Sequence, residues 1–298
     1  MLQHCLAMLG FVAKKFLIFM NYENPKIPEH INTSREHPLK DFSILLISAI
    51  VLVLLASFLL GFGGAWLAGK IPFSAENKIV AMYDITQHTD SKDHPEITQY
   101  LQDLADKISK AQNLPPEMKI TAHYMDSDTV NAFATLGGNL FIFRGLLEKL
   151  PSENSLVTLL AHEIAHVKYR HPIKSFGRGV AVSIAMTAVM GSTDSQVLGD
   201  AGMLTVLKFS RDMETQSDEE AMQTLQTMYG HLNGGAKLFE IFHEMRAEME
   251  SEEPAEFFST HPLDEKRIKN FSIVAKKKGW KEAGDLTPLP DFFKKSLN

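Results

Sequence analysis

Apolar residues fill one long segment near the start of the chain. No charged residue occurs from Phe42 to Gly69, and residues 44–62 are dense in Ile, Leu, Val, Ala and Phe. A helix needs about 20 mostly apolar residues to cross the hydrocarbon core of a membrane. Residues 42–69 therefore predict one transmembrane helix. A buried core helix and a cleaved signal peptide are the alternatives.

Beyond this segment, apolar residues follow two other patterns. Helical spacing predicts helices within residues 73–113, from Ser152 to about Tyr169, and over residues 217–229, 235–249 and 263–278. Short apolar runs bounded by turn residues predict strands at 119–124, 132–135 and 140–143, the last two as a hairpin across Gly137-Gly138. A run at 179–190 is too short to cross a bilayer and predicts a buried or membrane-surface helix. Together these patterns predict an α+β fold with a small sheet among many helices.

Charge and composition narrow the class of protein. The formal net charge is −6 and no block of Lys and Arg stands out, which argues against nucleic-acid binding. Cys5 is the only cysteine, so any zinc site must use nitrogen and oxygen ligands. Positive residues are more numerous before the apolar segment than after it. This places residues 1–41 in the cytoplasm and the domain of residues 73–298 outside the inner membrane, in the periplasm of a Gram-negative source.

The chemistry-bearing motif lies within one predicted helix. His162-Glu163-Ile164-Ala165-His166 is an H-E-x-x-H sequence, whose i, i+4 spacing puts both imidazoles on one helix face. There they can bind a single zinc ion. The Glu163 carboxylate neighbours this face and can take a proton from water that attacks a peptide carbonyl.

A catalytic zinc usually has three protein ligands. The best third candidate is Glu214, at the start of a later predicted helix. Asp218 follows one turn later and can accept a hydrogen bond from a ligating histidine. Taken alone, this acidic stretch is equally typical of a solvated helix face.

Three segments together resemble metallopeptidase family forty-eight, which includes HtpX, the CaaX prenyl-protein endopeptidases and the BepA-type periplasmic proteases. The first is the H-E-x-x-H helix. The second, Arg211 to Asp218, is similar to the family's R-x-x-E-x-x-x-D segment. The third is Asn131-Ala132-Phe133-Ala134, followed by Gly137-Gly138-Asn139. The resemblance covers residues 118–270 and implies a gluzincin-like zinc metallopeptidase domain.

The resemblance also implies roles for particular residues. One Zn²⁺ per chain would be held by His162, His166 and Glu214, with Glu163 as general base and Asp218 and Arg211 as supporting residues. An edge strand would pair with an extended substrate through Asn139, Leu140, Phe141, Ile142 and Phe143.

A downstream His-Pro element supplies one more candidate, His261. By resemblance, His261 would either donate a hydrogen bond to the oxyanion or occupy the open zinc position, with Arg267 in support. The alternative is a surface histidine that begins the helix at Pro262.

The expected function is zinc-dependent cleavage of misfolded or damaged membrane or envelope proteins. A single predicted span, residues 42–69, favours such a quality-control enzyme over the CaaX type, which has several spans. One alternative is a non-hydrolytic holdase, against which Glu163 argues because binding alone needs no base. The other is a polytopic intramembrane protease with residues 179–190 in a further span. For the first 19 residues, a start of translation at Met20 is a separate hypothesis.

Overall fold

The computed structural model describes most of the chain: residues 38–83, 89–190, 209–248 and 265–296, together with Glu23, Lys26, Phe257 and His261. Most of the predicted segment 1–41, including Met20, lies outside the described residues. The chain divides into two units, Met1–Leu52 and Val53–Asn298. The second unit combines helices with a small sheet, which confirms the predicted α+β class.

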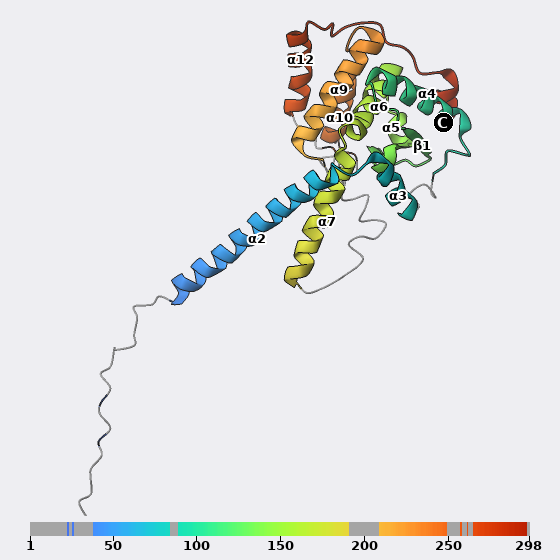
Figure 1. Ribbon diagram of the computed structural model, residues 1–298. Helices are drawn as coiled ribbons and strands as arrows, with labels where there is room; N and C mark the ends of the chain where they lie inside the picture. Colours follow the sequence, from blue (N-terminus) through green and yellow to red (C-terminus); the bar gives the residue numbers. More distant parts are fainter. Residues whose placement is uncertain are drawn as a thin grey trace, which may run out of the picture. The chain divides into compact units, whose positions relative to one another are not determined.

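The long apolar segment forms helix α2, Pro38–Ala68 (Figure 1). Among the described helices it is the one long and apolar enough to cross a membrane, with a mean hydropathy of 2.9 over its most apolar window. Only 6% of that window is buried, whereas a core helix would be buried on every face. Near its end, the exposed Trp66 ring lies 5.6 Å from the Lys70 ammonium. This pairing is typical of a membrane–water interface.

The C-terminal end of α2 packs closely on helix α7, His171–Met190. A Cβ atom at Gly64 would lie 2.5 Å from the Gly177 carbonyl oxygen, and one at Gly177 would lie 2.3 Å from the Ala68 Cβ. Small residues of this kind allow helix backbones to approach each other. The apolar run 179–190, predicted as a helix of its own, is the second half of α7.

Three strands form the sheet, as predicted: β1 Thr121–Met125, β2 Ala132–Ala134 and β3 Asn139–Phe143. The strand order is β1-β3-β2, with β1 parallel and β2 antiparallel to β3. The turn η1, Leu136–Gly138, joins β2 to β3 and confirms the hairpin. Gly138 has a φ of 77°, and a Cβ there would lie 2.1 Å from the Lys119 carbonyl oxygen, so this turn requires glycine.

The strand order corrects one prediction. The segment Asn139–Phe143 was expected at the edge of the sheet, but β3 is the central strand and pairs on both sides. Leu140 and Ile142 are 0% exposed, as the apolar run of a central strand requires. The backbone of Asn139, Leu140, Phe141, Ile142 and Phe143 is therefore engaged within the sheet and not available to pair with a substrate. The edge strand that contacts helix α6, Glu153–Lys168, is β2.

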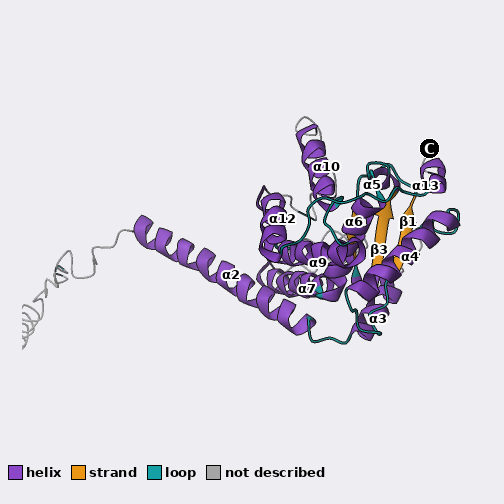
Figure 2. Cartoon of the chain, turned by 90° about the horizontal axis from the view of Figure 1, so that it is seen from above, coloured by secondary structure: helices purple, strands orange, loops and turns teal. Residues whose placement is uncertain are grey.

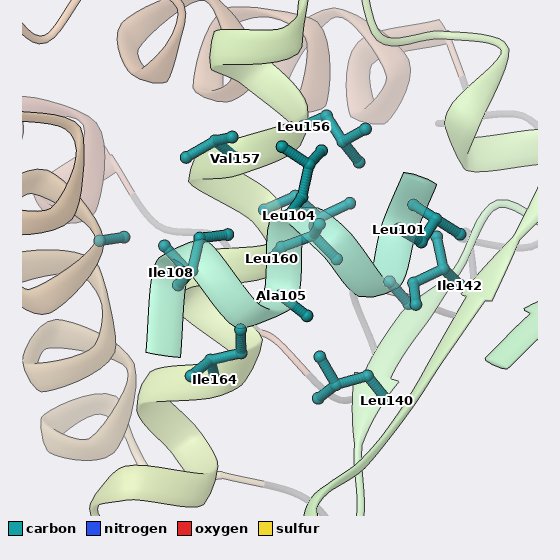
Figure 3. Packing of buried hydrophobic residues seen from close by; sticks show 14 of the residues in the cluster. Leu101, Leu104, Ala105, Ile108, Leu140, Ile142, Leu156, Val157, Leu160 and Ile164 are labelled. Atoms are coloured by element: carbon teal, nitrogen blue, oxygen red, sulfur yellow. The ribbon is translucent and has the colours of Figure 1, made fainter. Parts of the chain in front are cut away.

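The core lies between one face of the sheet and two helices, α4 (Pro95–Ala111) and α6 (Figures 2 and 3). Helical spacing gives α4 one apolar face, which packs on α6 and on β1. Figure 3 shows the side chains that meet there: Leu101, Leu104, Ala105 and Ile108 from α4, Leu156, Val157, Leu160 and Ile164 from α6, and Leu140 and Ile142 from β3.

Helix α9, Arg211–Tyr229, packs along α6. Both helices begin at serine caps: Ser152 Oγ accepts from the Ser155 amide, and Ser210 Oγ accepts from the Met213 amide. The remaining described helices surround this pair and the sheet: α3 Phe73–Tyr83, α5 Arg144–Leu147, α10 Gly235–Glu248, α12 Glu265–Lys278 and α13 Asp291–Ser296. Since α6 carries the H-E-x-x-H sequence and α9 carries Glu214, their packing assembles the site.

Candidate metal centre

Two imidazoles and one carboxylate meet between α6 and α9. The Nε2 atoms of His162 and His166 lie 3.0 Å apart, as expected one helical turn from each other. Glu214 places Oε2 3.5 Å from His162 Nε2 and Oε1 3.5 Å from His166 Nε2. Glu214 and His166 are 0% exposed. The structure thus brings together the three predicted ligands.

His261 completes this group of donors. Its Nδ1 lies 3.2 Å from Glu214 Oε1 and 3.4 Å from His162 Nε2. The ring is 0% exposed and stacks on Phe257 at a centroid distance of 4.8 Å. The alternative of a surface histidine is therefore wrong.

The spacing of the four donors suits zinc. A tetrahedral zinc with ligand distances of about 2.0–2.1 Å keeps its ligand atoms about 3.3 Å apart. Five of the six residue pairs within this group have donor atoms 3.0 to 3.5 Å apart, with either oxygen of Glu214 counted. One donor atom from each of the four residues lies within 4.8 Å of the other three. Three imidazole nitrogens and one carboxylate oxygen also match zinc chemically. These residues fit a zinc ion.

Glu163 directs one oxygen towards this group. Its Oε2 accepts a hydrogen bond from the Ala134 amide of β2 at 2.9 Å. Its Oε1 has no hydrogen-bond partner among the described residues and lies 3.5 Å from His261 Nε2. Burial raises the pKa of Glu163 above its usual range. One oxygen is therefore fixed and the other is left for proton transfer.

Asp218 and Arg267 hold the ligands in place. The Nδ1–H of His162 donates to Asp218 Oδ1 at 2.9 Å, which leaves Nε2 for the metal. Arg267 donates to Asp218 from Nε and Nη2 at 2.7 and 2.8 Å, and its Nη1 lies 2.8 Å from Glu214 Oε2. One buried guanidinium thus bridges both carboxylates.

The charges of these groups follow from their contacts. Burial alone would lower the pKa of His162, but hydrogen bonds to Asp218 and Glu214 outweigh it and raise that pKa to about 10. Burial would raise the pKa of Asp218, yet the neighbouring Arg267 holds that pKa below its usual value. The nearby histidines likewise hold the pKa of Glu214 well below its usual value, against the effect of burial. Both carboxylates stay ionised, which favours a bound cation.

Two predicted site positions lie elsewhere. The side chain of Asn139 contacts residues of the sheet and its turn: Oδ1 lies 2.9 Å from His123 Nε2, and Nδ2 donates to the Leu136 carbonyl oxygen. Arg211 is exposed at the first position of α9. Its supporting role stays a prediction.

Sequence reasoning missed two residues next to the ligands. His171, five residues after His166, places Nδ1 3.0 Å from Nδ1 of His166. Gln216 Oε1 lies 3.1 Å from Nε2 of His171. The signal in the sequence was Pro172, which ends the preceding helix and lets a new one begin at His171. Burial lowers the pKa of His171 to about 4, so this ring is neutral at pH 7.

A buried His-His-Glu donor set beside a second carboxylate on an H-E-x-x-H helix defines a metallopeptidase type of site. Residues 92–274 match the profile of the family described as Peptidase family M48. That range is more than half of the chain and contains all four candidate ligands. The chain therefore belongs to peptidase family M48. Zinc is the metal of this family's metalloproteases, and the donor set described above fits it.

Curated relatives carry protease names. The mitochondrial metalloendopeptidase OMA1 of Schizosaccharomyces pombe is 32% identical over 158 residues, which cover 51% of this chain and 46% of the relative. The beta-barrel assembly-enhancing proteases of Yersinia pestis and Escherichia coli strain K12 are 27% and 28% identical, over 58% of this chain and 38% of each relative. The chain thus spans less than half the length of these relatives.

Proposed function

We propose that this chain is a membrane-anchored zinc endopeptidase that cleaves unfolded or misfolded membrane and envelope proteins. The observation that carries the proposal is the buried cluster of His162, His166, Glu214 and His261 donors next to the Glu163 carboxylate. Helix α2 supplies the anchor, with the catalytic domain on the extracytoplasmic side. The protease names of the M48 relatives support the same class of reaction.

Zinc, when bound, supplies Lewis acidity that makes water acidic and a peptide carbonyl electrophilic at neutral pH. Glu163 Oε1 accepts the proton of the attacking water and delivers it to the nitrogen of the departing amine. The Ala134 amide holds Oε2, so the carboxylate keeps its orientation during this transfer. Asp218 keeps the proton of His162 on Nδ1.

We propose that an extended substrate pairs with the free edge of β2, and not with β3 as the sequence predicted. The Phe143 amide donates to the Asn131 carbonyl, and the Thr135 amide to the Asn139 carbonyl. Alternate residues of an antiparallel strand face opposite edges, so the backbone groups of Ala132 and Ala134 face away from β3. The Ala134 amide already reaches Glu163. An extended peptide added at this edge would pass beside the general base.

Metal removal tests the proposed activity on the full chain in detergent micelles. An unfolded protein and its native form are offered as substrates with and without a zinc chelator. We expect cleavage of the unfolded form alone, because strand pairing needs an extended backbone. Chelation should abolish cleavage, and stoichiometric zinc should restore it. Cleavage that persists after complete zinc removal would contradict the proposal.

We further propose that His261 closes the site when no substrate is present. The ligands His166 and Glu214, the base Glu163 and His261 itself are all 0% exposed, and Ala132 and Ala134 of β2 are equally buried. His261 Nδ1 lies beside the donor atoms of Glu214 and His162, so it would occupy the position that a catalytic zinc keeps open for substrate. A substrate carbonyl must take that position, so His261 has to leave it first.

The variant His261→Ala separates this gating role from oxyanion stabilisation. If His261 is a gate, His261→Ala should cleave faster, because the zinc position that His261 occupies becomes open to substrate. The variant should also bind zinc more weakly, because one donor is lost. An oxyanion donor that is removed should lower kcat by about 10²–10³-fold with zinc affinity unchanged. Kinetics and chelator competition on His261→Ala and on the control His231→Ala, a buried histidine of another region, distinguish the two. A large fall in kcat would rule out the gate.

A further inference from the structure

The break between α6 and α7 brings His171 against a zinc ligand. On a continuous helix, a separation of five residues turns the side chain by about 500°, which is about 140° from the ligand face. Arg170 instead adopts a left-handed φ of 60° between the two helices. Its guanidinium Nε and Nη2 donate to Glu76 Oε1 and to the Ile71 carbonyl, both at 2.8 Å. These contacts hold an unusual backbone conformation that turns His171 back towards His166.

Only one arrangement of hydrogens lets His166 bind a cation through Nε2. The lone pair of Nε2 must be free, so the hydrogen sits on Nδ1 and is donated to Nδ1 of His171 over 3.0 Å. His171 therefore carries its own hydrogen on Nε2, which it donates to Gln216 Oε1 over 3.1 Å. The amide oxygen can only accept, so it selects the tautomer of both imidazoles in turn.

We propose that His171 and Gln216 are positioning residues that hold His166 in the tautomer and orientation needed to bind zinc, an inference that rests on the proposed zinc site. Asp218 plays the same part for His162, because its Oδ1 accepts the Nδ1 hydrogen of His162 over 2.9 Å. Helix α9 then supplies the ligand Glu214, the Asp218 partner of His162 and the Gln216 partner of His171.

The packing around His171 defines the competing role, which is that of a buried filler. The residue is 1% exposed, and its ring stacks on Tyr169 at a centroid distance of 5.8 Å. Phe209 stacks on the His166 ring at 3.9 Å, so an aromatic neighbour already restricts that ring. An apolar side chain of similar size would meet the demands of packing alone. It would not accept the hydrogen of His166.

Zinc affinity, measured by competition with a chromophoric chelator, tests this without any peptidase assay. The full chain in micelles is compared with His171→Asn, whose Oδ1 keeps an acceptor near the position of Nδ1, and with His171→Leu, which keeps the volume only. We expect about 10–100-fold weaker zinc binding in His171→Leu and near-native affinity in His171→Asn. His231→Leu, a buried histidine away from the site, should bind zinc like the wild type.

The opposite pattern overturns the inference: native affinity in His171→Leu, or equal losses in the Leu and Asn variants. If His171→Leu does not fold, Gln216→Leu should weaken zinc binding and Gln216→Glu, which keeps an acceptor, should not. ¹⁵N NMR of histidine-labelled protein should also find the hydrogen of His171 on Nε2. A wild-type chain that binds no zinc would overturn both proposals, whereas zinc affinity that is insensitive to His171 would overturn this one alone.

Discussion

Glu163→Gln should abolish peptide cleavage and leave zinc binding intact. Glutamine has nearly the same shape, and its amide oxygen can still accept from the Ala134 amide, so the fold is preserved. No atom at the position of Oε1 can then take a proton from water. General-base catalysis contributes about 10²–10⁴-fold, and we expect kcat to fall by at least that factor. Initial rates on an unfolded protein and zinc content by elemental analysis measure both quantities.

Glu153→Gln is the matched control on the same helix. Glu153 accepts hydrogen bonds from the hydroxyl groups of Tyr100 at 2.7 Å and Tyr229 at 2.8 Å, but it lies at the start of α6, away from the metal site. The substitution Glu153→Gln should leave kcat per folded molecule unchanged. Native rates in Glu163→Gln would refute the mechanism. If neither the wild type nor Glu163→Gln cleaves but both bind unfolded chains, the holdase function is supported instead.

Local features were predictable from the sequence. The helix that carries His162 and His166 follows from apolar spacing and a serine cap, and the H-E-x-x-H spacing depends on that helix alone. The membrane helix follows equally from composition. The third ligand, Glu214, rested on the family resemblance, because an acidic stretch at the start of a helix is by itself ordinary.

Features set by contacts between distant segments were not predictable in this way. The order of strands depends on which segments pair, so an apolar run identified β3 but not its central place. The burial of His261 depends on Phe257 and on the packing of α6 with α9. The role of His171 depends on the left-handed backbone of Arg170, which Glu76 holds from a helix far away in the sequence. A pattern of residues carries no direct signal for such contacts.

Arg267→Leu should destabilise the zinc-free protein strongly. The substitution leaves Glu214 and Asp218, which are 0% and 6% exposed, without the guanidinium that bridges them. Removing one partner of a buried ion pair costs about 3–5 kcal/mol, because the remaining charge has lost its water. For a domain of this size we expect the apparent unfolding midpoint to fall by about 6–20 °C. Differential scanning fluorimetry in micelles measures the shift.

Added zinc and a control variant at a second arginine, Arg144, test this prediction further. Added zinc neutralises part of the uncompensated charge on Glu214. The difference in unfolding midpoint between Arg267→Leu and the wild type should therefore be smaller when zinc is present. Arg144 contacts three carboxylates, those of Asp126, Asp128 and Glu148, but its own side chain is 25% exposed and theirs are 41%, 89% and 40% exposed. Arg144→Leu should therefore shift the midpoint little, because water and salt screen such pairs. Equal shifts in the two variants would mean that the buried bridge contributes no more than a surface network, and that Glu214 and Asp218 are held by other contacts.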